Sequence, residues 1–156
     1  MKGNDKIISV LNAFLADELT AISQYMVHSE MCANWEYGKL HEAIEKRAID
    51  EMKHAEKLIA RIIFLEGKPV VSQLNKISIG ADVEAQLRND QAAEDGAIKA
   101  YNEGIRLCLE VGDNGSRELI DGNLVDEEAH LDWLEAQLDQ IAQMGLQNYL
   151  LGQTKE

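Results

Sequence analysis

The sequence predicts an all-α protein in which four long helices form a bundle, with a long crossover before the third helix and a short fifth helix at the C-terminal end. Apolar residues recur at helical spacing through four long segments, and glycine-rich or irregular stretches separate them. A single proline and an aromatic content of 5% favour helices over a strand-rich sandwich. At 156 residues, we expect one compact domain spanning residues 1–156.

The first two predicted helices form a hairpin. Apolar residues at helical spacing run from Lys6 to about Asn34, and a second such run covers about 39–66. The short break at 35–38 makes the two helices antiparallel neighbours. Gly67 followed closely by Pro69 ends the second helix, because this pairing is a typical helix stop.

The second half repeats this arrangement after a long connection. Residues 69–80 show no helical period. About fourteen residues at roughly 3.3 Å each span some 45 Å, the length of a helix of about 30 residues, so the flanking helices can run parallel. Asp82 caps a third helix that reaches about Val111, and 112–115 break it. The fourth helix is expected over 116–144, and a short apolar tail follows at 146–151.

Charge and cysteine usage limit the classes of partner. The formal net charge of -13 disfavours nucleic acid and anionic membranes and favours cations. Cys32 and Cys108 lie far apart, so the chain encodes neither a zinc knuckle nor covalent haem attachment, and a reducing compartment fits best. No apolar run reaches the roughly 20 residues that span a bilayer. We therefore expect a cytoplasmic protein with no membrane or nucleic-acid partner.

An internal repeat of 76 residues relates the two halves. This shift places Glu18 on Glu94, and it places the Asp-Glu-x-x-His motif at 50–54 on the same motif at 126–130. In each half a Glu is followed, 33 residues later, by the first residue of a Glu-x-x-His motif. Such a repeat predicts a bundle with a pseudo-two-fold axis.

The repeated motifs predict a site for two metal ions. Positions i and i+3 of a helix lie about 60° apart, so both residues of each Glu-x-x-His can face one point. Buried carboxylates repel one another, whereas two divalent cations would balance four of them, and mixed carboxylate and imidazole ligation suits iron or manganese. The alternative, that the acids line solvated faces and the histidines pack, fits one motif better than a doubled set. The predicted ligands are Glu18, Glu51, His54, Glu94, Glu127 and His130.

This ligand set resembles that of the bacterioferritins, and the resemblance covers residues 1 to about 155. It implies a ferritin-like four-helix bundle, assembled as a hollow shell of 24 subunits, that stores iron. It also implies ferroxidase activity, the oxidation of Fe2+ to Fe3+ by O2 or H2O2. By resemblance, Glu51 and Glu127 bridge the irons of a di-iron centre. Glu18 and His54 are the terminal ligands of one iron, and Glu94 and His130 are those of the other.

The resemblance also implies a haem. Met52 follows Glu51 directly, so it is rotated by about 100° away from the metal-facing direction. In bacterioferritins the Met at this position is an axial ligand of a b-type haem shared between two subunits. That haem assists iron release, with a small ferredoxin as the expected reductant. The alternative is an apolar residue that packs at an interface.

Aromatic residues are weaker candidates. Tyr25 and Tyr101 lie two helical turns after Glu18 and its repeat, so they either hydrogen-bond ligand carboxylates or pack in the core. Trp35 and Trp133 are expected to be packing or interface residues rather than redox relays.

The remaining acidic residues and histidines support only weak functional predictions. Some family members place an extra inner iron on an Asp and on a His one turn before it. Here Asp50 has Lys46 at that earlier position, which argues against the extra site. His28 and His41 have no Glu three residues before them, and we expect them at the surface or in an interface.

Several other functions are compatible with parts of the sequence. A rubrerythrin-like peroxidase or a manganese catalase would use the same bundle, but the Cys-rich domain usual in rubrerythrins is absent. A haem electron carrier or a purely structural bundle would not need the complete ligand set. A Dps-like DNA protector is disfavoured by the acidic charge.

Overall fold

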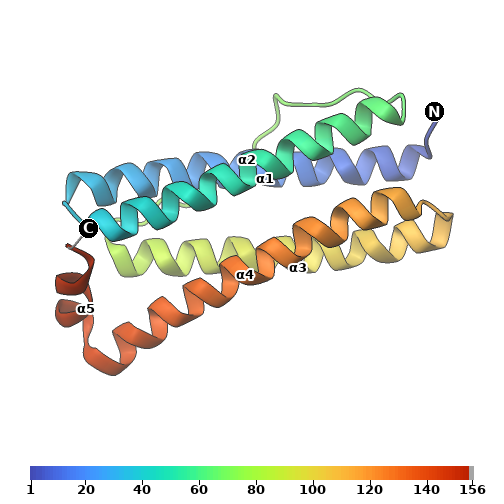
Figure 1. Ribbon diagram of the computed structural model, residues 1–156. Coiled ribbons are helices and arrows are strands. Elements are labelled where there is room, and N and C mark those ends of the chain that lie inside the picture. Colours follow the sequence, from blue (N-terminus) through green and yellow to red (C-terminus); the bar gives the residue numbers. More distant parts are fainter. Residues whose placement is uncertain (155–156) are drawn as a thin grey trace.

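The computed structural model describes residues 1–154 and places them in five α-helices (Figure 1). These residues contain no strand, which confirms the predicted all-α bundle with a short fifth helix. In the same residues no helix is long and apolar enough to cross a membrane. The helices are α1 (Asp5–Asn34), α2 (Gly38–Phe64), α3 (Val83–Val111), α4 (Asn114–Met144) and α5 (Leu146–Gln153).

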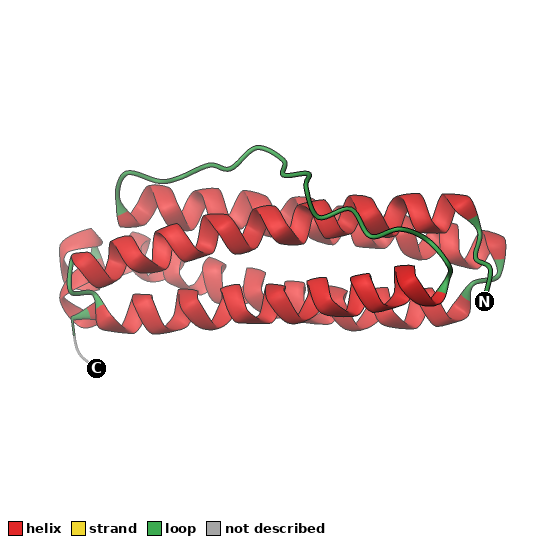
Figure 2. Ribbon diagram, turned by 90° about the horizontal axis from the view of Figure 1, so that it is seen from above, coloured by secondary structure: helices red, strands yellow, loops and turns green. Residues whose placement is uncertain are grey.

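The connections give the bundle its topology. Short turns make α1 antiparallel to α2 and α3 antiparallel to α4, whereas the connection at 65–82 runs along the outside of the bundle (Figure 2). This crossover lets α2 and α3 run in the same direction, as predicted. Side chains of α1 hold it by accepting hydrogen bonds from its backbone: Asn12 from Val70 (2.9 Å), Thr20 from Asn75 (2.8 Å) and Gln24 from Ser78 (3.0 Å).

Helix ends agree with the predictions except at the end of α2, which is Phe64 rather than Glu66, and at the start of α4. The side chain of Asp82 caps α3 by accepting a hydrogen bond from the N–H of Ala85 at 2.8 Å, as predicted. The predicted start of the fourth helix at Ser116 was wrong, because α4 begins at Asn114. Asp113 is its N-cap and accepts from the N–H of Ser116 at 3.0 Å. Only Gly112 of the predicted four-residue break adopts the left-handed conformation that ends α3 (φ 77°).

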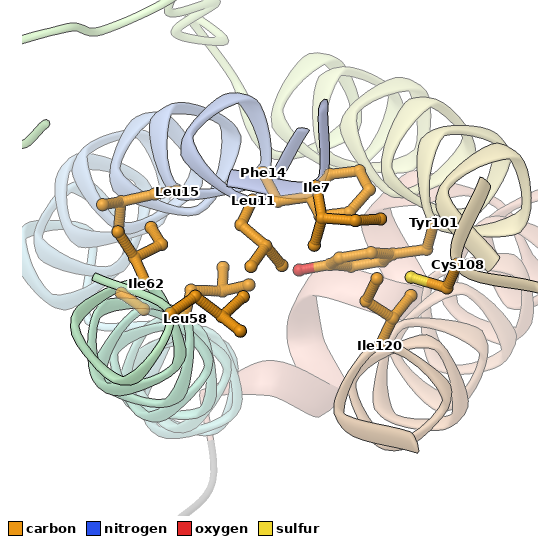
Figure 3. Close-up of a cluster of buried hydrophobic side chains, with 11 residues drawn as sticks. Ile7, Leu11, Phe14, Leu15, Leu58, Ile62, Tyr101, Cys108 and Ile120 are labelled. Atoms are coloured by element: carbon orange, nitrogen blue, oxygen red, sulfur yellow. The ribbon is translucent and has the colours of Figure 1, made fainter. Parts of the chain in front are cut away.

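Two apolar clusters fill the bundle, one toward each end. The first includes Leu11, Phe14 and Tyr101 together with aliphatic residues of α2 and α4 (Figure 3). The second includes Tyr25 and Leu87 and reaches Tyr149 of α5. On every long helix a buried glutamate lies between residues of the two clusters, so the centre of the bundle is polar.

Candidate metal centre

The six predicted ligands meet in this central polar layer. Each is buried, with exposed fractions of 1% to 7%. They form two groups, and within each group one ligand atom from every residue lies within 4.8 Å of the others. Glu51 and Glu127 belong to both groups. The first group adds Glu18 and His54 to this pair, and the second adds Glu94 and His130.

Every one of the six side chains keeps one buried polar atom without a hydrogen bond. Some of these atoms are close, as are His54 Nδ1 and Glu127 Oε1 at 2.9 Å, but they lack hydrogen-bonding geometry. Buried polar groups without partners are costly, and a cation bound among these atoms would remove that cost. The atoms are Glu18 Oε2, Glu51 Oε1, His54 Nδ1, Glu94 Oε2, Glu127 Oε1 and His130 Nδ1.

Two tyrosines hold the other oxygens of the glutamates. The hydroxyl of Tyr25 donates to Glu94 Oε1 at 2.5 Å, and that of Tyr101 donates to Glu18 Oε1. Both rings are also buried in the apolar clusters, so each tyrosine fulfils both predicted roles. These hydrogen bonds leave Oε2 of each glutamate directed at the cluster.

Two aspartates hold the imidazoles in a matching way. His54 Nε2 lies 2.8 Å from Asp126 Oδ2, and His130 Nε2 lies 3.0 Å from Asp50 Oδ2. A carboxylate on the outer nitrogen fixes the ring and leaves Nδ1 for a metal. Sequence reasoning missed this function, although the repeat places an Asp directly before each Glu-x-x-His motif. Lys46 also pairs with Asp50, at 3.3 Å.

The pKa values show how the cluster is charged when it holds no metal. Burial, followed by neighbouring carboxylates, raises the pKa of Glu18 and of Glu127. Burial also acts to raise the pKa of Glu51, but the close approach of the Glu18 and His130 side chains lowers it well below its usual range. Burial opposes protonation of His130, yet the carboxylate of Glu51, 3.0 Å from its Nδ1, raises its pKa to about 10. Protons thus stand in for the cations that bound metals would supply.

Comparisons with known proteins identify the family. A model of the ferritin-like domain matches residues 8–144. The bacterioferritin of Rhodobacter capsulatus is 42% identical over 151 residues, which cover 97% of this chain and 94% of the relative. Those of Brucella melitensis (41%, covering 96% and 92%) and Mycobacterium leprae (36%, covering 96% and 94%) are similar throughout. The chain belongs to the bacterioferritin family. The two Glu/His groups fit the di-iron site that the resemblance to bacterioferritins implies.

A hollow of about 240 Å3 between α1 and α3 leads to the centre of this bacterioferritin chain. Its inner wall contains Glu18, Glu51 and Glu127, and its outer part is lined by Asn75 and Lys76 of the crossover. The hollow lies on the side of the bundle that the crossover covers.

Met52 faces away from the metal centre, as its position after Glu51 predicts. Its side chain is 47% exposed, whereas Glu51 is buried. It lines an apolar groove on α1 and α2 together with Ile22, Met26 and Ile49.

The surface prediction for His28 was wrong. The side chain is fully buried, its Nδ1 lies 2.9 Å from Asp90, and its Nε2 accepts from the N–H of Gly80. Its spacing from Glu18 and Tyr25 puts all three residues on one helix face, a signal that was available in the sequence. His41 is only partly exposed and contacts Ser29.

Two further side chains border the centre. Trp133 is partly buried against the second apolar cluster, in agreement with its predicted packing function, and Trp35 is placed similarly. Arg47, which the sequence analysis overlooked, is buried and lies over the ring of Tyr25 at 4.2 Å. It shares the helix face of Glu51 and His54, since the three are spaced by four and three residues.

Proposed function

We propose that this chain is an iron-storage ferroxidase. Its substrate is Fe2+, two ions of which bind per chain, and its ferric product is stored inside a closed shell of 24 copies. Membership of the bacterioferritin family implies iron storage and supports an oligomeric shell. The observation that carries the ferroxidase proposal is the set of six buried side chains, each with an unpaired ligand atom directed at the same centre.

The proposed ligand assignments follow the two groups. Glu51 and Glu127 bridge the two ions, since they alone belong to both groups. Glu18 and His54 complete one position, and the corresponding pair of the second half completes the other. Four carboxylates balance the charge of two divalent ions, so the filled site is neutral before oxidation. Oxygen ligands favour the harder ferric ion and thereby lower the free energy of the oxidised state.

The residues around the ions assist oxidation by holding geometry. Each Fe2+ gives up one electron, and a single oxidant molecule accepts both. O2 takes up the two electrons with two protons and leaves as H2O2, whereas H2O2 takes them up with two protons and leaves as two waters. Tyr25 and Tyr101 fix the outer oxygens of two glutamates, and two aspartates fix the imidazoles. These hydrogen bonds keep the ligand atoms in place as the charge on the ions increases.

Iron oxidation tests the proposed centre. Addition of two Fe2+ per chain in air should give a rapid ferric absorbance in the wild type, slowed by orders of magnitude in Glu51→Ala and His130→Ala. Glu42→Ala, an exposed change on the same helix, is the matched control and should keep the wild-type rate. Unchanged initial rates in Glu51→Ala would refute the site. Oxygen release from H2O2 with bound manganese, without iron oxidation, would instead favour the catalase alternative.

The size of the assembly tests storage. Light scattering of the purified protein should show a closed particle of about 24 chains. A dimer as the only species in solution would contradict the storage function while leaving the metal centre untouched.

The second part of the proposal is a b-type haem shared by two copies of the chain, with Met52 as the axial ligand from each. The exposed thioether and the apolar groove around it support this. A bound haem would supply electrons for iron release, and a small ferredoxin is the proposed donor. Haem-replete protein should show the low-spin spectrum of two thioether ligands, and Met52→Leu should lose it. Met26→Leu changes the same groove and should keep the spectrum. Persistence of the low-spin spectrum in Met52→Leu would overturn the assignment of Met52 as the haem ligand.

A further inference from the structure

The two halves of the metal centre are related by the 76-residue repeat, but the side chains behind the two tyrosines are not repeated. Behind Tyr25 lie three ionisable side chains, whereas the equivalent positions behind Tyr101 carry none. The pairs are Arg47 with Asn123, Asp90 with Phe14, and His28 with Gly104. A pseudo-symmetric set of ligands therefore has an asymmetric surrounding.

A full positive charge touches the ligand Glu94. Arg47 is 4% exposed, and its Nη2 lies 3.5 Å from Glu94 Oε1, the oxygen that also accepts from Tyr25. Its Nη1 lies 3.4 Å from Asp90 Oδ2. Because arginine keeps its proton in proteins, this charge is permanent, and burial limits its screening by solvent.

Asp90 only partly offsets this charge at the metal. Its carboxylate accepts from Gln24 Nε2 at 2.8 Å and lies 2.9 Å from the ring of His28, so two side chains of α1 also bind it. It precedes Glu94 by one helical turn, whereas the guanidinium of Arg47 contacts Glu94 directly. The ion bound by Glu94 thus has a permanent positive charge in contact with one of its ligands.

The other half is electrically neutral behind its tyrosine. The amide of Asn123 donates to the hydroxyl of Tyr101 at 3.4 Å, and the Phe14 ring packs against the Tyr101 ring with centroids 4.6 Å apart. Within residues 1–154, no lysine or arginine forms an ion pair with Glu18.

We propose that Arg47 makes the two metal positions unequal, so that the position of Glu18 and His54 binds a divalent cation at least about tenfold more tightly than the position of Glu94 and His130. The inference rests on the proposed di-metal function. Arg47 repels a cation at the position of Glu94 and His130 directly. It also draws electron density from the Glu94 carboxylate, which should bind that cation. The position of Glu18 and His54 should fill first, and the ion at the other position should exchange more readily.

A crystal of the unmodified protein tests the order of filling. Metal-free assembled protein is given one Co2+ per chain without oxygen, and anomalous scattering is measured at the cobalt edge. The signal between Glu18 and His54 should be several times stronger than that between Glu94 and His130. Equal signals, or a stronger signal beside Glu94, would overturn the inference alone. No signal at either position at saturating Co2+ would overturn the proposed di-metal function itself.

A matched pair of variants tests the cause. Arg61 is another arginine of α2 that pairs with an aspartate; it is partly buried and lies 14 residues, about 21 Å, from Arg47. Anaerobic Co2+ titration of Arg47→Gln, followed by cobalt absorbance and calorimetry, should show the two affinities converging toward a ratio of one. Arg61→Gln and Arg47→Lys should keep the ratio of tenfold or more. An unchanged ratio in Arg47→Gln contradicts the inference, and the crystal measurement does not depend on that variant folding.

Discussion

Gly104→Ala should weaken the bundle and disturb the metal centre together. A Cβ at this position would lie 2.5 Å and 2.9 Å from two atoms of the Phe14 ring. That ring is 3% exposed and packs against Tyr101, so it cannot move freely (Figure 3). Overpacking costs about 1–3 kcal/mol, and the better helix propensity of alanine returns about 1 kcal/mol. We expect a net loss of about 0–2 kcal/mol, with Tyr101 displaced from Glu18.

Gly122→Ala on α4 is the matched control. No atom beyond the local helix backbone lies within 4 Å of a Cβ at this position, so the same substitution should stabilise the fold by about 0.5–1 kcal/mol. Urea denaturation of the metal-free proteins at one protein concentration gives both values, since assembly makes stability depend on concentration. Cobalt titration then shows whether Gly104→Ala alone weakens metal binding. If Gly104→Ala stabilises the protein as much as the control does, the packing explanation is wrong.

Three further changes test contacts outside the ligand set. Asp50→Asn and Asp126→Asn each replace the carboxylate that fixes one imidazole by a neutral amide. Each should lower Co2+ affinity by about 10- to 100-fold in an anaerobic titration. Unchanged affinity would mean that the rings are held by packing alone. Burial opposes ionisation of Asp113, but hydrogen bonds with Ser116 and the ion pair with Arg61 lower its pKa below the ordinary 3.8. Its contribution to stability is therefore complete above that value and is lost as the pH falls through the lowered pKa. Asp113→Asn keeps the helix cap, so its deficit in urea midpoint should be largest near neutral pH and shrink between about pH 4 and pH 2, whereas a deficit independent of pH would refute the charge effect.

The helices and the six proposed ligands could be predicted because they depend on local regularities. Helical period and glycine-rich breaks indicated where the chain turns, and the repeat indicated which positions face the centre. The start of α4 was missed because Asn114 and Gly115, which look like part of a turn, fit the first turn of a helix once Asp113 caps it. A local pattern alone does not distinguish these two arrangements.

The contacts around the ligands could not be predicted in the same way, because they depend on how the helices are rotated against one another. His28 and Arg47 look like surface charges in the sequence, yet each finds a buried partner in Asp90. Their spacing relative to Glu18 and Glu51 placed them on buried faces. The sequence did not indicate that α3 would place the carboxylate of Asp90 beside both side chains.

The direction of the supporting hydrogen bonds follows from the pseudo-two-fold arrangement. Because α1 and α3 are antiparallel, a tyrosine two turns after its own glutamate reaches across to the glutamate of the other helix: Tyr25 bonds to Glu94, and Tyr101 bonds to Glu18. The aspartates cross between α2 and α4 in the same way. Each half of the chain therefore supplies ligands whose supports come from the other half. The geometry of the centre depends on how the two hairpins pack, so a change in core packing far from the ligands, such as one at Gly104, can alter metal binding.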